Sequence, residues 1–293
     1  MLFYHSMGIN RISFGIQDFN EEVQVDVDRM QPDFLVARLL TPEIRSLFPN
    51  GVNFDIMCGL PRQTRESFND TLDKVIRLSP DRVSLLTMNM TPETAPHQLK
   101  MSIDKIPDAL TAKIYLLDAI EKFTSNGYVR TGFDHFAKPE DSVAQAQQKG
   151  TMRWGSFGCT AGRYQDFLGI GTSSFSRLGS RHSAQNVYSL DVWKKMISQG
   201  EFPILRGHNQ SNDDIIRRDV TQRLRAYPLI RYEDVNAEHG VDFKTYFARE
   251  LERLNLLAED GLVELNADGF EMTDFGTLFA DFIAEEFDAY VRH

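Results

Sequence analysis

The feature that most constrains the fold of this chain is the alternation of strand-like and helix-like segments in its first half. Three segments, residues 11–17, 52–57 and 82–87, alternate apolar and polar residues in the manner of half-buried strands. Helical patterns separate them. Because parallel neighbours need a crossover connection, usually a helix, this order predicts a parallel sheet and places the chain in the α/β class.

The clearest helical pattern lies between the second and third of these strands. Thr64 can cap its first turn, apolar residues then recur at helical spacing, and Ser79 followed by Pro80 ends it. A second helix is predicted over residues 109–126, with Gly127 as its cap and a strand over residues 128–133 behind it. The sequence therefore supplies the crossovers that a parallel sheet requires.

The parity of the first two strands predicts where a ligand would bind. Apolar residues occupy one face of each strand, which is expected to pack on helices, so Gln17 and Asp55 fall on the opposite face. Both lie near the carboxyl ends of adjacent parallel strands, where open α/β sheets and barrels bind ligands. The alternative is that both side chains only hydrogen-bond to loop backbone.

The cysteines and histidines do not predict a metal site. Cys58 and Cys159, the two cysteines of the chain, are too far apart in the sequence for a disulfide framework or a CxxC-type ligand pair. The histidines show no HExxH or similar spacing. His135 follows Asp134 at the end of a predicted strand, where adjacent side chains point to opposite faces. We therefore expect His135 to be structural rather than a base or metal ligand that acts with Asp134.

Two glycine-containing segments resemble known turn motifs. Residues 59–64 predict a strand-to-helix turn, for which a structural role suffices. Residues 169–174 partly match the GxGxxG dinucleotide fingerprint, but serine replaces the third glycine and no strong strand precedes it. The surrounding residues 150–179 are expected to form a folded loop region.

The character of the chain changes after Ser211, so we predict domains at 1–210 and 211–293. Helices at 212–226 and 243–255, a hairpin-like pair of segments and a final helix resemble a winged-helix arrangement. Residues 241–293 hold 4 basic and 13 acidic residues, a net charge of −9 out of −10 for the chain. Because nucleic acids are bound through clustered Lys and Arg, this charge favours a packing or lid role and argues against nucleic-acid binding.

Composition excludes several other classes. The chain is 42% hydrophobic and 25% charged, as is typical of a soluble globular protein of one or two domains. We find no run of about 20 apolar residues for a membrane span and no signal-peptide pattern at the start. The sequence therefore predicts a cytoplasmic protein with no membrane partner.

Several short motifs, taken in order, resemble those of the oxygen-independent coproporphyrinogen III oxidases. They run along almost the whole chain, which makes the resemblance specific. The matching segments are residues 8–20 (GINRISFGIQDFN), 53–55 (NFD), 59–61 (GLP), 63–64 (QT), 80–82 (PDR), 134–139 (DHFAKP), 166–171 (DFLGIG), 184–186 (AQN) and 216–220 (IRRDV).

Members of that family are radical S-adenosylmethionine enzymes of haem biosynthesis, which oxidatively decarboxylate two propionates of coproporphyrinogen III to give protoporphyrinogen IX. The resemblance implies the later half of a partial TIM-like (β/α)6 barrel plus a C-terminal, mainly helical, winged-helix-like domain. In the family a CxxxCxxC-type loop binds a [4Fe-4S] cluster, and this chain lacks that motif. Because such a cluster needs three thiolates, we expect no cluster ligands here and no activity from this chain alone.

Carried onto this sequence, the family pattern makes Gln17, Arg29 and Asp55 contacts of S-adenosylmethionine. Gln17 and Asp55 are the residues that strand parity places at the ligand-binding edge. Arg29 would pair with the carboxylate of the cofactor. The alternative interpretation is that Arg29 is only a charged residue on the surface of a helix. The pattern identifies no catalytic residue.

Other positions depart from the family pattern or cannot be ranked by it. Asn89 stands where a small apolar residue is usual, and Phe175 replaces an aliphatic one. The loop at 155–162 (GSFGCTAG) differs from the usual NFQGYTTQ, so a second S-adenosylmethionine is not expected there. The carboxylates of coproporphyrinogen III need cationic partners. The candidates are Arg130, Lys138 and Arg163.

The missing earlier barrel strands have a structural consequence. The strand at 11–17 becomes a bare parallel edge, which we expect to pair with another copy, to be covered by residues 1–8, or to be completed by a separate N-terminal fragment.

Two alternative functions stay open at this stage. One is a non-catalytic remnant or haem-trafficking protein that binds a tetrapyrrole or S-adenosylmethionine, although the AQN motif at 184–186 favours the oxidase. The other is an interaction protein that acts through its acidic tail.

Overall fold

The computed structural model describes residues 1–92, 95–155, 158–162 and 166–291. It divides into two compact units, Met1–Ala161 and Gly162–His293, and each is described by itself. The boundary expected at residue 210 falls inside the second unit, between strand β10 (Ile204–Asn209) and helix α9 (Asn212–Ala226). The division into domains at 1–210 and 211–293 stays a prediction.

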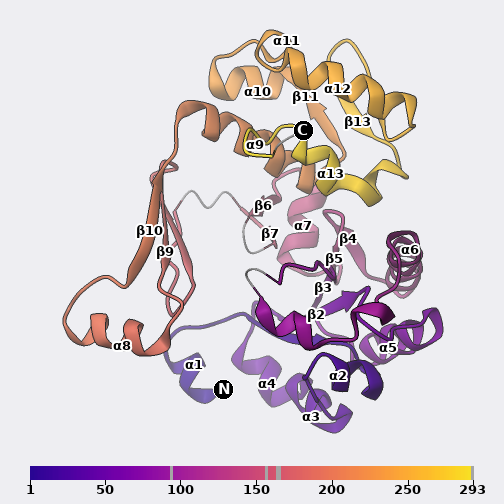
Figure 1. Ribbon diagram of the computed structural model, residues 1–293, viewed down its shortest axis with the longest axis vertical. Helices are drawn as coiled ribbons and strands as arrows, with labels where there is room; N and C mark the ends of the chain where they lie inside the picture. Colours follow the sequence, from indigo (N-terminus) through magenta and orange to yellow (C-terminus); the bar gives the residue numbers. More distant parts are fainter. Residues whose placement is uncertain (93–94, 156–157, 163–165, 292–293) are drawn as a thin grey trace. The chain divides into compact units, whose positions relative to one another are not determined.

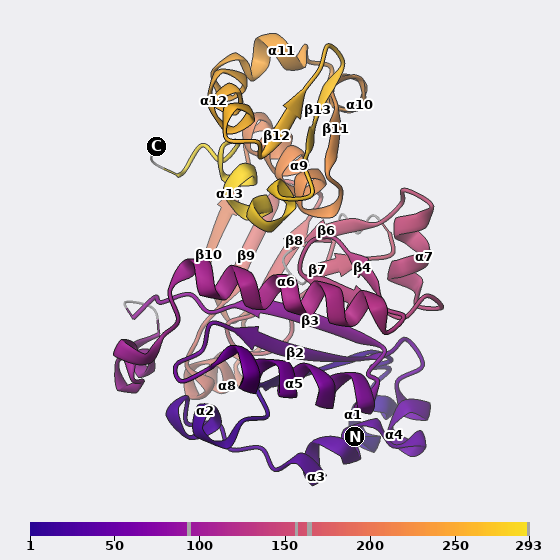
Figure 2. The same cartoon turned by 90° about the vertical axis from the view of Figure 1, so that its right-hand side faces the viewer.

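The first unit is built around a mixed sheet with the strand order β1-β2-β3-β5-β4. β1 to β3 are parallel, as the alternation predicted, whereas β5 runs antiparallel to both β3 and β4 (Figures 1 and 2). The strands are β1 (Ile12–Gln17), β2 (Val52–Cys58), β3 (Arg82–Thr87), β4 (Val129–Thr131) and β5 (His135–Ala137).

Two long helices cover the apolar face of this sheet. In α5 (Arg65–Leu78), Thr64 accepts a hydrogen bond from the backbone N–H of Ser67 at 3.1 Å, which confirms the predicted cap. Figure 2 shows α5 and α6 (Ala109–Ser125) along the same side of the sheet. A one-residue slip in register would expose this core, so burial fixes which residues face the other side. The buried residues include Val52, Phe54, Ile56, Phe68, Leu72, Val75, Ala119 and Phe123.

Short elements make up the remaining connections of the first unit. They are α1 (Leu2–Ser6), α2 (Glu21–Asp26), α3 (Asp33–Ala37), η1 (Arg38–Leu40), α4 (Pro42–Leu47), η2 (Pro96–Lys100), η3 (Ile103–Lys105), α7 (Ser142–Gln148), β6 (Arg153–Gly155) and β7 (Gly158–Thr160).

The strand predicted at 128–133 is wrong in its second half. β4 ends at Thr131, and the chain then turns and returns as β5, which pairs with both β4 and β3. Gly132, with φ of 65°, opens that turn, and Asp134 lies inside it. Asp134 and His135 are therefore not successive residues of one strand, and the argument that their side chains must point apart fails.

β1 is the edge of the sheet, and no strand in the described ranges pairs with its free side. Ile12 donates its backbone N–H to Gly51 at 3.2 Å, so the backbone groups of the alternate residues Ser13 and Gly15 point away from β2. The side chain of Gln31 donates to the carbonyl of Gly15 at 2.9 Å. Helix α1 has no buried residue, so the expected cover by residues 1–8 is not seen.

Among the residues that the structure describes, no helix has the length and apolar character needed to cross a bilayer.

The second unit begins with an antiparallel sheet in the order β10-β9-β8. β8 (Phe175–Leu178) and β9 (His182–Asn186) form a hairpin, and α8 (Leu190–Ser198) connects β9 to β10. Residues 150–179, predicted as a loop region, thus also contain β6, β7 and β8.

The 169–174 segment is a turn and not a dinucleotide fingerprint. It leads directly into strand β8, whereas the fingerprint must open a helix. A Cβ on Gly169 would lie 2.2 Å from the carbonyl oxygen of Phe175, so close backbone approach explains this glycine. Asn186 of the AQN motif donates to the carbonyl of Gly171 at 2.8 Å. A hydrogen bond therefore joins two of the family-like motifs, those at 166–171 and 184–186.

The C-terminal part of the second unit combines helices with a small sheet in the order β11-β13-β12. Helix α9 was predicted at its observed bounds, whereas the helix predicted at 243–255 is two helices that meet at Phe247. The elements after α9 are β11 (Leu229–Arg231), α10 (Tyr232–His239), α11 (Phe243–Tyr246), α12 (Ala248–Glu259), β12 (Val263–Leu265), β13 (Gly269–Met272), η4 (Gly276–Phe279) and α13 (Ala280–Glu285).

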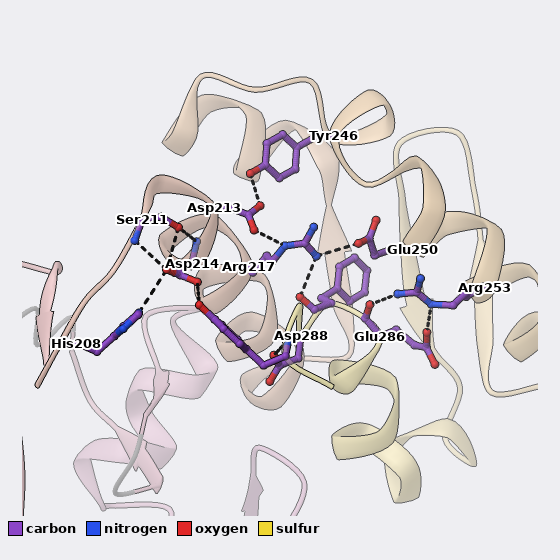
Figure 3. A network of polar contacts seen from close by, with 12 residues as sticks. His208, Ser211, Asp213, Asp214, Arg217, Tyr246, Glu250, Arg253, Glu286 and Asp288 are labelled. Atoms are coloured by element: carbon purple, nitrogen blue, oxygen red, sulfur yellow. Dashed lines mark hydrogen bonds and ion pairs between the residues drawn. The ribbon is translucent and has the colours of Figure 1, made fainter. Parts of the chain in front are cut away.

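Polar contacts join the start of α9 to the C-terminal segment (Figure 3). Asp214 accepts hydrogen bonds from the backbone N–H of Ser211 at 2.8 Å and from the hydroxyl of Tyr290 at 2.8 Å. These bonds, that of Ser211 above all, lower the pKa of Asp214 to about 2. The carboxylate of Asp214 is thus ionised over the physiological range and anchors Tyr290 to the helix.

Candidate functional site

The carboxyl end of β1 carries an arrangement that we call the Gly15 cradle, formed by Gly15, Gln17 and Arg29. A Cβ placed on Gly15 would lie 2.7 Å from Nε2 of Gln17 and 3.0 Å from Nη2 of Arg29, so both side chains reach across the glycine. The β1–β2 register shifts between Gly15 and Gln17, and Gln17 has φ of 69°. Such a bulge re-aims a side chain. The cradle therefore depends on glycine at position 15.

Asp55 lies directly across from Gly15 on the neighbouring strand. Its Oδ2 accepts a hydrogen bond from the hydroxyl of Ser13 at 3.0 Å, and its Oδ1 accepts one from the amide of Asn53 at 2.7 Å. The side chain of Asn53 in turn contacts Ser84 on β3. These bonds orient a half-buried carboxylate beside the cradle, so the structure brings Gln17, Arg29 and Asp55 to one end of the sheet.

Arg29 is held by the loop that follows α2 and is not on a helix, so its reading as a helix surface charge is wrong. Gln31 donates its side-chain amide to the carbonyl of Gly15, and its backbone N–H donates to Oε1 of Gln24 at 3.0 Å. Gln24 is buried and also donates to the carbonyl of Asp18 at 2.8 Å. Two glutamines thus fix the loop against β1 while the guanidinium stays exposed.

A buried carboxylate fixes the turn directly after Gln17. We call it the Asp18 clamp, formed by Asp18, Gln63 and Thr71. Asp18 accepts hydrogen bonds from the Gln63 amide at 2.6 Å and from the Thr71 hydroxyl at 2.8 Å, and all three side chains are buried. Burial raises the pKa of Asp18, although its hydrogen bonds oppose that change. The clamp ties the end of β1 to helix α5.

Gln63 also ties the end of β1 to the end of β2. Its side-chain amide donates to the carbonyl of Met57 at 2.8 Å, and its Oε1 accepts from the backbone N–H of Leu60 at 3.0 Å. Sequence reasoning gave the 59–64 turn a structural role and did not single out Asp18 or Gln63. The signal it missed is the matching of both residues to family-like motifs, at 8–20 and 63–64.

The chemistry of the Gly15 cradle suits a ligand with both positive and negative groups. The exposed guanidinium of Arg29 can bind a carboxylate, and Asp55 can accept from an ammonium or hydroxyl group. Oε1 of Gln17 is buried and has no hydrogen-bond partner among the described residues, which leaves an acceptor for a ligand donor. S-adenosylmethionine carries a carboxylate, an ammonium and ribose hydroxyls, so these residues fit it.

The cysteines, by contrast, do not fit an iron–sulfur cluster. Cys58 and Cys159 are both buried, and the thiol of Cys159 donates to the carbonyl of Thr131 at 3.4 Å. Burial raises the pKa of both thiols, that of Cys159 to about 12, so neither is a thiolate at neutral pH. Across the described ranges, no group of three His, Cys, Asp or Glu side chains could hold a metal ion.

Two of the three cations proposed for the substrate carboxylates, Lys138 and Arg130, contact oxygen atoms of the chain itself. Nζ of Lys138 lies 3.8 Å from Oδ1 of Asp81. Asp81 directly precedes β3, so this pair lies at the amino end of that strand, whereas the Gly15 cradle lies at the carboxyl end of β1. Arg130 donates from Nε and Nη2 to the carbonyl of Phe133 at 3.0 and 2.8 Å. Arg163 lies outside the described residues.

The departures from the family pattern have ordinary structural settings. The carbonyl of Asn89 accepts from the side chain of Gln98 at 3.0 Å, and Phe175 is 42% exposed on β8. The 155–162 loop includes part of the β6–β7 hairpin, and its residues 156–157 lie outside the described residues. Whether it binds a second cofactor stays a prediction.

No family model matches the chain. The chain is 36% identical over 286 residues to the oxygen-independent coproporphyrinogen III oxidase of Pseudomonas aeruginosa, covering 97% of this chain and 62% of that protein. It is 36% identical over 287 residues to the protein of the same name from Thermostichus vulcanus, covering 98% of this chain and 88% of that protein.

A solved structure gives the same result. Coproporphyrinogen III oxidase (HemN) from Escherichia coli, described as a radical SAM enzyme, superimposes with a TM-score of 0.88 at 35% identity. The match covers 98% of this chain and 65% of that one. The chain thus spans about 62% of the length of the first curated relatives that it matches.

Proposed function

The chain belongs to the oxygen-independent coproporphyrinogen III oxidase family, and on that premise we propose that it forms the later part of a radical S-adenosylmethionine catalytic unit. Its reaction is the oxidative decarboxylation of two propionates of coproporphyrinogen III in haem biosynthesis. The observation that carries this proposal is the Gly15 cradle, because it joins Gln17, Arg29 and Asp55 at the carboxyl end of the parallel strands.

Each residue of the site has a separate role in this proposal. Arg29 binds the carboxylate of S-adenosylmethionine, Asp55 accepts from its ammonium or ribose hydroxyls, and Gln17 accepts a further hydrogen bond through Oε1. When bound, the cofactor supplies the radical chemistry of the family. The residues of this chain bind and orient it, and the Asp18 clamp keeps the turn beneath Gln17 rigid.

We propose that the [4Fe-4S] cluster is bound by protein outside this chain, because the two buried thiols here cannot bind it. The mixed sheet of the first unit is then the later half of a (β/α)6 barrel. From α9 onward the elements run helix, strand, helix, helix, helix, strand, strand with the sheet order β11-β13-β12, which supports a winged-helix-like domain. Its acidic charge supports a role in protein packing rather than in binding nucleic acid.

The free edge of β1 is expected to pair with a strand of the protein that carries the cluster. In the isolated chain, the outward backbone amides of Ser13 and Gly15 are therefore expected to exchange far faster than those of Asp55 and Ser84 in the inner strands. Amide hydrogen exchange followed by NMR checks this. Protection of both amides together with a dimeric mass in light scattering would instead show that a second copy covers the edge.

Replacing Gly15 by alanine tests the cradle without destabilising the fold. The three atoms nearest to the new Cβ belong to the flexible ends of Gln17 and Arg29, and alanine in a strand is no less stable than glycine. We expect roughly 10- to 100-fold weaker binding of S-adenosylmethionine, equivalent to one or two lost polar contacts, with an unchanged or slightly higher melting temperature. Isothermal titration under anaerobic conditions measures the affinity.

The control for Gly15→Ala is Ser67→Ala, which weakens the capping box of α5 in the same unit and leaves the cradle intact. If Gly15→Ala binds the cofactor as wild type does, the cradle is not the binding site. If wild type itself shows no affinity, the proposal for this chain falls.

A second candidate function is a non-catalytic protein that binds S-adenosylmethionine or a tetrapyrrole. The burial of both cysteines favours it for the chain on its own. Repeating the titration after iron and sulfide reconstitution, with the iron counted, separates the two. Activity that appears only when a cluster-bearing partner is added supports the catalytic role. If no such partner produces activity, the non-catalytic binding function is supported.

A further inference from the structure

The antiparallel sheet β10-β9-β8 of the second unit carries a row of three side chains on one face. Strand pairing sets Gln185 of β9 between Phe175 of β8 and Arg206 of β10, and β9 and β10 are seen side by side in Figure 1. Residues that pair directly across neighbouring strands point to the same face. Gln185 is buried, whereas Phe175 and Arg206 are exposed. This face therefore presents an aromatic ring and a guanidinium on either side of a buried amide.

The amide of Gln185 has a fixed orientation. Its Nε2 donates to the carbonyl of Ser173 at 3.2 Å, so the opposite end of the amide is the acceptor Oε1. Nε of Arg206 donates to this oxygen at 2.8 Å, and the hydroxyl of Tyr188 donates to it at 3.2 Å. Gln185 belongs to the AQN motif at 184–186, and it holds the side chains of Arg206 and Tyr188 against β9.

Arg206 is arranged to bind an anion. Its Nε is taken by Gln185, which leaves both Nη groups of the planar guanidinium for a ligand. No ion pair within the described ranges holds this guanidinium, and every residue of β10 is exposed, so a ligand can reach it. The pairing of β10 with β9 shifts between Ile204 and Arg206, and such a bulge re-aims a side chain. A guanidinium fixed in this way is suited to bidentate binding of a carboxylate.

The surroundings of Arg206 favour a flat apolar ligand that carries carboxylates. Residues 166–211 hold 5 basic and 3 acidic residues, a net charge of +2 in a chain whose net charge is −10. A local excess of positive charge attracts anions. The rings of Phe175 and Tyr188 are exposed on this sheet and offer apolar surface. Phe175 stands two strands from Arg206, about 10 Å at the usual strand spacing of about 4.8 Å, which is within the span of a tetrapyrrole.

We propose that Arg206, oriented by Gln185, binds a propionate carboxylate of the tetrapyrrole substrate, whose macrocycle packs on Phe175. This inference rests on the proposed function and names a substrate contact in the second unit. Arg206 supplies a cation that Arg130 and Lys138 do not offer, because those two contact oxygen atoms of the chain itself. Gln185 is a positioning residue, because it acts on the substrate through Arg206.

The test measures tetrapyrrole binding and cofactor binding separately on the 293-residue chain. Coproporphyrin III, the aromatic tetracarboxylate, is titrated by fluorescence, and its tetramethyl ester serves as the ligand without carboxylates. S-adenosylmethionine is titrated by calorimetry. We expect Arg206→Gln to bind coproporphyrin III roughly 10- to 100-fold more weakly, as the loss of charged hydrogen bonds implies, and to bind S-adenosylmethionine as wild type does. The ester should not distinguish the variant from wild type.

Two further variants separate a specific contact from general attraction between charges. Lys195→Gln removes the same charge from the exposed helix α8 and should change neither affinity. Arg206→Lys keeps the charge but loses the planar guanidinium, so it is expected to recover only part of the affinity. If Arg206→Gln does not fold, Arg206→Lys replaces it and should still bind more weakly than wild type. Equal losses in Arg206→Gln and Lys195→Gln would overturn the site.

Gln185→Met tests the positioning role, because methionine fills a similar space but gives Arg206 no amide oxygen. We expect it to weaken coproporphyrin III binding by roughly 3- to 10-fold, as one lost hydrogen bond implies, and to cause no further loss when it is added to Arg206→Gln. A merely structural role would weaken binding equally with and without Arg206, and that result would refute the positioning role.

The possible outcomes separate this inference from the proposed function. If wild type binds S-adenosylmethionine but not coproporphyrin III, or binds both with no loss in Arg206→Gln, the role of Arg206 is overturned and the cradle stands. If wild type binds coproporphyrin III through Arg206 but does not bind S-adenosylmethionine, the cradle falls and the Arg206 contact stands. Binding of neither ligand overturns both.

Discussion

Replacing Arg217 by methionine is expected to lower the free energy of unfolding of the C-terminal part of the second unit by about 3–5 kcal/mol. Arg217 bonds to Asp213 at 2.9 Å and to Glu250 at 2.8 Å, and it donates to the carbonyl of Phe287 at 3.2 Å (Figure 3). Glu250 is 7% exposed. Methionine fills the space of the side chain but leaves the carboxylate of Glu250 buried without its cation, which is the source of the loss.

The aromatic cluster beneath Arg217 makes the effect cooperative. Its guanidinium lies over the ring of Phe247, which packs edge-on against Phe287 at a centroid distance of 5.3 Å. Both rings are fully buried. Loss of the arginine therefore loosens the contact between α12 and the C-terminal segment as well as the ion pair.

Urea titration of the full chain, followed by hydrogen exchange of the α9 and α12 amides, measures this loss. The double variant Arg217→Met/Glu250→Leu removes both charges and is expected to recover most of the stability, because replacing both partners leaves no buried charge. A double variant as unstable as the single one would mean that packing, not the uncompensated charge, sets the effect.

The parts of the fold that the sequence predicted are those determined by local patterns. Parity placed Asp55 on the face of β2 opposite to Phe54 and Ile56, which are fully buried. Gln17 follows a register shift in β1 and has a positive φ, so parity alone does not set the direction of its side chain. Thr64 was identified as a cap because its side chain and the α5 N-terminus lie within one turn. Arg29 came from the family resemblance alone, since nothing in its loop predicts that it reaches across Gly15.

The parts that could not be predicted depend on contacts between distant segments. β5 turns back to pair with β3, about fifty residues earlier in the chain, and this pairing moved Asp134 into a turn beside His135. Helix α10 was missed because it buries only Tyr232 and Val235 and so has little periodicity. In the Asp18 clamp, Gln63 and Thr71 lie 45 and 53 positions after Asp18 in the sequence, and no local pattern predicts such contacts.

Replacing Asp18 by alanine is expected to lower the free energy of unfolding of the first unit by about 2–4 kcal/mol and to weaken S-adenosylmethionine binding at least 10-fold. The change leaves the buried donors of Gln63, Thr71 and the Asn20 backbone without their acceptor. It also removes the support of the turn that holds Gln17 at positive φ. Urea titration and calorimetry measure the two effects.

A merely structural role for Asp18 would lower stability without a matching loss of affinity. Thr64→Ala is the control, because it removes the α5 cap, at a cost of about 1 kcal/mol, without touching the clamp. We expect it to bind S-adenosylmethionine as wild type does when both proteins are measured well below their unfolding transitions. Equal affinity of Asp18→Ala and Thr64→Ala would refute the positioning role.

The pH dependence of stability gives an independent check on the clamp. Because burial raises the pKa of Asp18 above that of the unfolded chain, its contribution to stability is complete below about pH 4 and is lost as the pH rises through the folded pKa. Asp18→Asn keeps the size of the side chain but cannot ionise. Relative to that variant, wild type is therefore expected to lose stability as the pH rises above about 4 in urea titrations. A difference that stays constant above that pH would show that the pKa of the Asp18 carboxyl is not raised in the folded protein.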